Sequence, residues 1–123
     1  MLGVTVFTVA AALAIGLHAL LILGAPIGFM TMGGHISGVL PARARVVSLV
    51  QVVLLVVFIA IVFERAGLAS FAPNLSWPIW IVVAVSALSL LANTITPSKR
   101  ERLFGMPVGF GFLSGSLLVA LGE

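Results

Sequence analysis

Cysteine is absent from the 123 residues of this chain. The sequence therefore excludes disulfides, thiolate nucleophiles, thiolate metal sites and iron–sulfur clusters, and cysteine usage gives no indication of the redox compartment. Histidines and carboxylates are almost as scarce, with two of the former and three of the latter. These numbers are too small for most metal or acid–base sites. We therefore expect no metal, no cofactor and no enzymatic activity.

Charged residues make up only 7% of the chain, against about 25% in an ordinary soluble domain. Disordered chains are polar and rich in charge, so disorder is excluded as well. The six basic residues are too sparse for the dense positive patch that nucleic acid requires, and we expect no nucleic-acid partner. Since 62% of the residues are apolar, the composition indicates that the lipid bilayer is the main surroundings of the protein.

Four apolar runs occupy most of the chain. Each approaches the roughly 20 helical residues that cross about 30 Å of hydrocarbon, and a helix satisfies its backbone groups internally where an isolated strand in lipid could not. The first run lacks a preceding basic segment and exceeds the length of a signal-peptide core, so we keep it as a helix. The predicted fold class is an all-α membrane protein, an antiparallel bundle of four transmembrane helices in one domain spanning residues 1–123. We place the helices at about residues 2–24, 46–63, 77–96 and 103–121.

The connection between the first two predicted helices is apolar but interrupted by glycine and proline. Pro26 and Pro41 bracket it, and four glycines lie between them. This segment is too broken for a fifth span, so we expect an interfacial loop over residues 25–42, with a partly re-entrant loop as the alternative. The connection between the second and third helices is plainer, and we expect it to turn at Pro73 and Asn74.

The basic residues predict an orientation. Five of the six lie in the first and third connections, where we expect them to contact lipid headgroups: Arg43, Arg45, Lys99, Arg100 and Arg102. Only Arg65 lies on the other side of the predicted bundle. Because Lys and Arg accumulate in cytoplasmic loops, we predict a multi-pass protein of the cytoplasmic (inner) membrane. Loops 25–45 and 97–102 would then be cytoplasmic, and both termini would lie outside.

Small residues spaced four apart allow helix backbones to approach closely in lipid. The first predicted helix offers Ala12 with Gly16, and the fourth offers Gly105 with Gly109 and Gly111 with Gly115. We favour packing within the chain, while self-association through the fourth helix stays open as an alternative.

Polar side chains from three of the predicted helices converge in the cytoplasmic half of the bundle: His18, Ser48, Gln51, Ser89 and Asn93. Polar residues inside a membrane often mark a functional site. They also serve as interhelical hydrogen bonds worth about 0.6 to 2 kcal/mol. Both a polar cavity and a structural hydrogen-bond cluster are therefore compatible with this pattern.

Two functions follow from these alternatives. The first is an accessory or structural membrane subunit, held in a homo-oligomer or bound to another membrane protein. The second is a small channel or carrier for a neutral or weakly charged solute, with a polar cavity in the cytoplasmic half. A cavity bounded by the polar residues would favour the second, and direct hydrogen bonding that leaves no cavity would favour the first.

Overall fold

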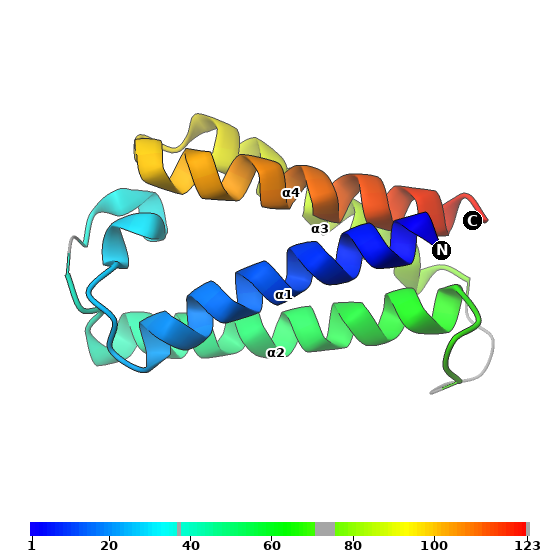
Figure 1. Ribbon diagram of the computed structural model, residues 1–123, viewed down its shortest axis with the longest axis horizontal. Helices are drawn as coiled ribbons and strands as arrows, with labels where there is room; N and C mark the ends of the chain where they lie inside the picture. The colour runs from blue at the N-terminus through cyan, green and yellow to red at the C-terminus, as the bar shows by residue number, and fades with distance from the viewer. Residues whose placement is uncertain (37, 71–75, 123) are drawn as a thin grey trace.

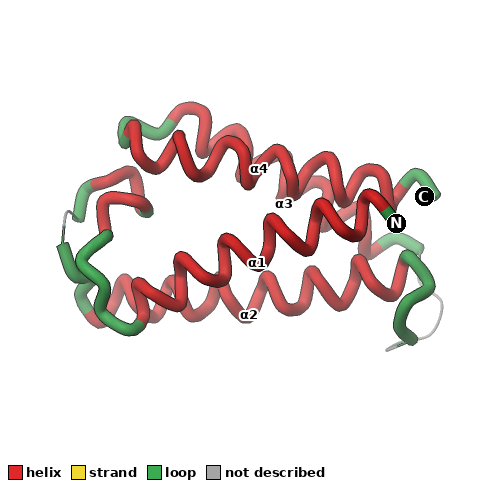
Figure 2. Tube along the Cα trace, in the orientation of Figure 1, coloured by secondary structure: helices red, strands yellow, loops and turns green. Residues whose placement is uncertain are grey.

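The computed structural model describes residues 1–36, 38–70 and 76–122 of the chain. These ranges contain four long helices and two short 3-10 helices: α1 Leu2–Ile22, η1 Gly28–Met30, η2 Met32–Gly34, α2 Ala42–Arg65, α3 Pro78–Ile95 and α4 Lys99–Ala120. Successive long helices run in opposite directions, and both termini lie at the same end of the bundle (Figure 1). The loops gather at the two ends of the bundle (Figure 2).

All four long helices have the length and apolar composition needed to cross a membrane. The predicted fold class is confirmed: the protein is a small, all-helical, multi-pass membrane protein. We call the end that carries the termini the terminal end. The opposite end, with η1, η2 and the α3–α4 turn, is the basic end. The turn predicted at Pro73 and Asn74 lies outside the described residues.

Two helices begin earlier than the sequence predicts. Helix α2 begins at Ala42 after an extended Pro41, and α4 begins at Lys99 after Ser98. The Ser98 hydroxyl accepts a hydrogen bond from the Glu101 N–H at 3.2 Å, which caps α4. The charge of the basic residues predicts loop positions, but long cationic side chains in the first turn of a helix can extend toward the membrane surface.

The helices diverge from the terminal end toward the basic end. Near the termini, one core cluster joins all four helices through the buried side chains Phe7, Val62, Ile79, Val82 and Val119. Toward the basic end, separate clusters join α1 to α4 and α1 to α2. Helix α4 packs closely on α3 and on α1, whereas α2 makes few contacts with α3. Helices α2 and α3 therefore separate in the half of the bundle next to the basic end.

The glycines of α4 pack inside the chain. A Cβ atom at Gly105 would lie 2.5 Å from Asn93 Cγ, and one at Gly109 would lie 3.3 Å from Leu90 Cα, so both glycines face α3. A Cβ at Gly111 would lie 3.0 Å from Ala10 Cβ on α1. At Gly115 it would lie 2.7 Å from the Phe7 nitrogen, also on α1. These four positions hold α4 against two neighbours.

The prediction that Ala12 and Gly16 pack within the chain is wrong. Both residues are exposed, and no atom lies within 4 Å of a Cβ built at Gly16. Ala10, Ala11 and Ala14 occupy the buried face of α1 instead. Because α1 is apolar on every side, its sequence does not indicate which face turns inward.

Candidate functional site

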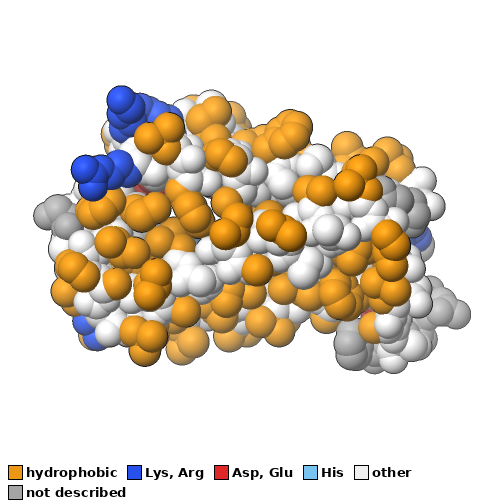
Figure 3. All heavy atoms as spheres, viewed as in Figure 1, with side chains coloured by type: hydrophobic (Ala, Val, Ile, Leu, Met, Phe, Trp, Pro, Cys, Tyr) orange, Lys and Arg blue, Asp and Glu red, His pale blue; other side chains and the backbone are white. Residues whose placement is uncertain are grey.

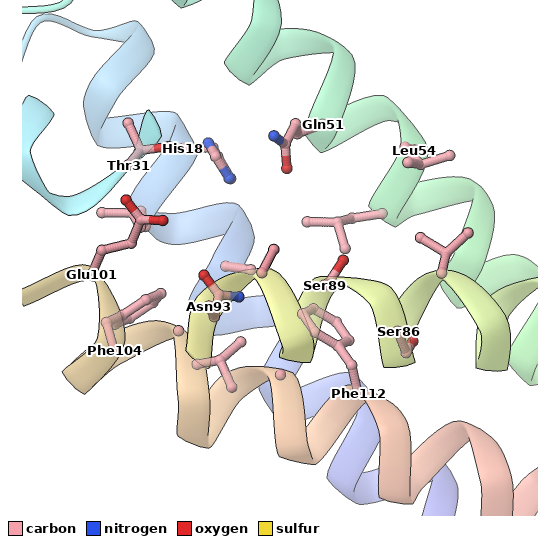
Figure 4. A pocket seen from close by; sticks show the side chains of 18 of the residues that line it. His18, Thr31, Gln51, Leu54, Ser86, Ser89, Asn93, Glu101, Phe104 and Phe112 are labelled. Carbon is pink, nitrogen blue, oxygen red and sulfur yellow. The ribbon is translucent and has the colours of Figure 1, made fainter. Parts of the chain in front are cut away.

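A cavity of about 310 Å³ occupies the space left between α2 and the α3–α4 pair. Helix α1 forms one of its walls, and residues of η1 and its flank border it toward the basic end. Polar side chains line this cavity together with leucine, valine and phenylalanine: His18, Thr31, Gln51, Ser86, Ser89, Asn93 and Glu101. Figure 4 shows that the labelled polar residues come from all four long helices and from the loop after α1, and surround a shared space.

Four of the five polar residues singled out in the sequence line this cavity, namely His18, Gln51, Ser89 and Asn93. Ser48 lies behind them, fully buried. Its hydroxyl forms a hydrogen bond with Nδ1 of His18 at 3.1 Å, which joins α1 to α2. The structure therefore combines one direct interhelical hydrogen bond with a polar cavity.

The Ser48 hydrogen bond also orients the His18 ring. With Nδ1 engaged, the other ring nitrogen, Nε2, has no hydrogen-bond partner within the described part of the chain. Since His18 lines the cavity, the imidazole can offer one nitrogen to a ligand while the other holds α2. His18 thus belongs both to the interhelical hydrogen bond and to the cavity lining.

Glu101 is a cavity residue that the sequence analysis did not identify. Its Oε2 atom accepts a hydrogen bond from the Gly33 N–H at 2.8 Å. The pattern from Ser98 to Glu101 is the serine-x-x-glutamate signature of a helix N-terminus, and it could have located both the start of α4 and this carboxylate. In that signature the glutamate normally turns back to the first residue of the pattern, whereas here it bonds the loop before α2.

The loop before α2 is seated on the N-terminus of α4. The Ser98 hydroxyl donates a hydrogen bond to the Phe29 carbonyl oxygen at 2.8 Å. The Arg100 guanidinium lies 4.7 Å from the centre of the Phe29 ring. A Cβ atom at Gly34 would lie 2.7 Å from Ser98 Cβ, so the two segments touch closely. Phe29 and Ser98 thus hold the loop in place beside the cavity.

The loop covers the helix ends at the basic end, as expected of an interfacial loop (Figure 1). Protein groups satisfy part of its backbone, since the Gly28 N–H donates to the Gly38 carbonyl oxygen at 2.9 Å. A Cβ atom at Gly28 would lie 2.5 Å from the Ile36 carbonyl oxygen, so only glycine fits there. His35 is exposed, and it is not among the residues that line the cavity.

The five basic residues expected at lipid headgroups lie around the basic end but outside the cavity lining. Arg43, Lys99 and Arg100 are exposed, and basic side chains are visible on this end of the surface in Figure 3. Arg45 Nε donates to the Leu40 carbonyl oxygen at 2.9 Å, and Arg102 Nη1 donates to a backbone carbonyl just after α3 at 2.6 Å. Glu101 is the single formally charged residue among those that the structure places around the cavity.

The cavity opens sideways between α2 and α3. Gln51 and Leu54 of α2 and Ala92 of α3 line the cavity and are also exposed on the surface of the bundle. Exposed apolar side chains surround this opening, among them Val53 on α2 and Leu88 and Leu91 on α3, as expected for a face that contacts lipid. A ligand could therefore reach the polar groups from within the membrane.

The chemistry available in the cavity is hydrogen bonding with one negative charge. Hydroxyl, amide and imidazole groups can donate and accept, and the carboxylate accepts. Among the described residues, no three histidine or acidic side chains cluster closely enough to hold a metal ion. No protein-family model, curated protein or solved structure matches the chain.

Proposed function

We propose that this protein is a small membrane carrier, which binds a neutral or weakly charged solute in the cavity between α2 and the α3–α4 pair. The observation that supports this proposal is the polar lining at membrane depth. Polar groups in hydrocarbon are costly unless they are paired or serve a function. A volume of about 310 Å³ lies at the lower end of the range of small-molecule sites.

A carrier fits the shape of the bundle better than an open channel does. The terminal end is closed by the fully buried side chains of Phe7, Val62, Ile79 and Val82. The cavity lies on the other side of this packed cluster, in the half of the bundle next to the basic end. A solute that crosses the membrane therefore needs a rearrangement of the packed half, which is the property of a carrier.

We further propose that the basic end faces the cytoplasm, because five of the six basic residues gather there. The chain contains no cysteine, so a single introduced cysteine reports its own position. In intact cells, a membrane-impermeant maleimide should label Ser70→Cys from outside and should label Lys99→Cys only after the cells are opened. The opposite pattern would reverse the orientation.

The carrier proposal can be tested in proteoliposomes with glycerol, urea, formamide and methylammonium as probe solutes. The test variant is Ser89→Leu, which fills the cavity lining. The matched control is Ala87→Leu, an exposed position on the same helix. We expect at least one probe to cross faster than in empty liposomes, and we expect that flux to fall in Ser89→Leu but not in Ala87→Leu. If no probe crosses faster than in empty liposomes, or if both variants behave alike, the carrier proposal is wrong.

The exposed pair Ala12 and Gly16 favours a second candidate, an accessory subunit or homo-oligomer. Both residues are exposed, no atom lies within 4 Å of a Cβ built at Gly16, and small residues spaced four apart allow a second helix to approach closely in lipid. Substitution of Gly16→Leu should then dissociate the assembly in mild detergent, as measured by light scattering. An unchanged particle mass would contradict assembly through the exposed surface around Ala12 and Gly16.

A further inference from the structure

Glu101 places an incompletely satisfied carboxylate in the cavity. Its Oε2 atom is bonded by the Gly33 N–H, whereas Oε1 has no hydrogen-bond partner among the residues that the structure describes. The side chain lines the cavity, and Figure 4 shows it near Thr31 and Asn93 at the edge of the shared space. One carboxylate oxygen is therefore available to a ligand.

Three of the five basic residues at the basic end have partners other than Glu101. Arg100 stacks on the Phe29 ring, Arg102 bonds a backbone carbonyl just after α3, and Arg45 bonds a carbonyl of the loop just before α2. Within the described ranges, Glu101 has no ion pair, and no lysine or arginine lines the cavity. Glu101 is thus the formally charged residue of the lining, and its charge is opposite to that of the surrounding basic surface. Glu101 is half-buried, and a half-buried carboxylate attracts a nearby positive charge more strongly than one in bulk water does.

Much of the cavity lining is apolar and aromatic. Phe104 and Phe112, on the same helix as Glu101, and Phe58 of α2 line the cavity together with aliphatic side chains. Aromatic faces attract cations as well as apolar groups. The opening between α2 and α3 gives access from the hydrocarbon, where an amphipathic molecule accumulates. The lining thus complements a molecule with one positive group and a compact apolar body.

We infer that the solute of the proposed carrier is a small organic cation, such as a protonated amine, whose charged group binds Glu101 and whose apolar part lies against Phe104 and Phe112. This inference rests on the proposed function. Within the neutral or weakly charged solutes proposed above, it selects those that carry one positive charge. An anion would be repelled by Glu101, and a neutral isostere would lack the charge interaction.

Charged thiol reagents test the sign of the interior directly, because the chain contains no cysteine. The Ser89→Cys variant places a thiol in the cavity lining, and Lys99→Cys places one on the exposed basic surface. Each variant is prepared in lipid nanodiscs and treated with a trimethylammonium-ethyl or a sulfonato-ethyl methanethiosulfonate. Each rate is divided by the rate of the same reagent with free 2-mercaptoethanol, and on this relative scale we expect the cationic reagent to react about tenfold faster in Ser89→Cys, the scale of one nearby charge. At Lys99→Cys the anionic reagent should be faster.

Adding Glu101→Gln to Ser89→Cys should bring the two rates to within about twofold of each other. Glutamine keeps a carbonyl oxygen to accept the Gly33 N–H, so the loop contact is preserved. In Ser89→Cys with Glu101 intact, phenethylammonium should slow modification, and 2-phenylethanol of the same shape should slow it much less.

Four outcomes overturn the inference, and they distinguish it from the proposed function. Equal rates for the two reagents, or a cation preference that survives Glu101→Gln, would refute the charge assignment and leave a water-accessible solute cavity. Equal protection by phenethylammonium and 2-phenylethanol would refute the organic-cation class while leaving the cavity as a binding site. If Lys99→Cys reacts and Ser89→Cys reacts with neither reagent, the cavity is closed to solutes, and the proposed function fails with the inference.

Discussion

The close approach of α4 to α1 at Gly115 predicts a specific cost for a single methyl group. In Gly115→Ala, the new Cβ atom would lie 2.7 Å from the Phe7 nitrogen and 2.8 Å from the Gly3 carbonyl oxygen. Both are backbone atoms of α1, so neither can swing aside as a flexible side chain could. Ordinary van der Waals contact begins at 3.4 Å, and the two helices must therefore separate locally by about 0.7 Å.

The magnitude follows from this displacement. A gap of 0.5 to 1 Å loses about a quarter to a half of the dispersion energy of each contact at the interface, and overpacked sites in proteins cost about 1 to 3 kcal/mol. Against this, alanine is a better helix former than glycine by about 1 kcal/mol. A variant with the same chemical change at an open position isolates the steric cost, because the helix-forming gain is common to both.

Gly16→Ala is that control. Gly16 lies inside α1, and nothing lies within 4 Å of a Cβ built there. We expect Gly115→Ala to have a free energy of unfolding about 1 to 3 kcal/mol lower than Gly16→Ala, measured by titration with sodium dodecyl sulfate in mixed micelles. Equal stability of the two variants, or a more stable Gly115→Ala, would refute the close packing of α1 and α4.

Three further substitutions test other contacts. Ser48→Ala removes the hydrogen bond to His18 and should lower the free energy of unfolding by about 0.6 to 2 kcal/mol, whereas Ser114→Ala, whose hydroxyl bonds only its own helix, should change it little. Similar losses in both would show that the interhelical bond contributes nothing specific. Gly28→Ala places a methyl group 2.5 Å from a loop carbonyl oxygen. This variant should speed amide hydrogen exchange in the loop, whereas the amides of α3 should keep their protection. Unchanged exchange in the loop would contradict its tight packing around Gly28. Arg65→Met removes a 2.8 Å hydrogen bond to the last turn of α4 and should lower the free energy of unfolding by about 0.5 to 2 kcal/mol. An unchanged free energy of unfolding in the same detergent titration would show that this hydrogen bond does not stabilise the bundle.

Part of the candidate site was visible in the sequence. The direction of each predicted helix places His18, Gln51 and Asn93 at similar depth, and the structure arranges them around one cavity. Depth follows from position along a helix, which sequence alone supplies. Ser48 illustrates the limit, since its depth was correct but its side chain lies behind the cavity against His18.

For Glu101, the sequence pattern from Ser98 predicts a position in the first turn of α4, but it does not predict that the carboxylate lines a cavity. Glu101 sits among three basic residues at positions 99, 100 and 102, which suggested a surface loop. Its carboxylate reaches the cavity because α4 begins at Lys99 and the loop before α2 supplies the Gly33 N–H. That loop lies 68 residues away in the chain, and no local pattern encodes its position.

The sequence by itself determined that four apolar helices form and that most of the basic residues lie at one end of the bundle. Both properties are local: the length of an apolar run and the absence of water force a helix, and the positions of the arginines follow from the order of the helices. Only the tertiary structure decided that Gly115 faces α1, that Gly16 faces outward and that α2 separates from α3 around Glu101. In lipid, a helix face that packs against protein is about as apolar as one that contacts hydrocarbon. The choice between them therefore comes from the fit of backbones and side chains between helices.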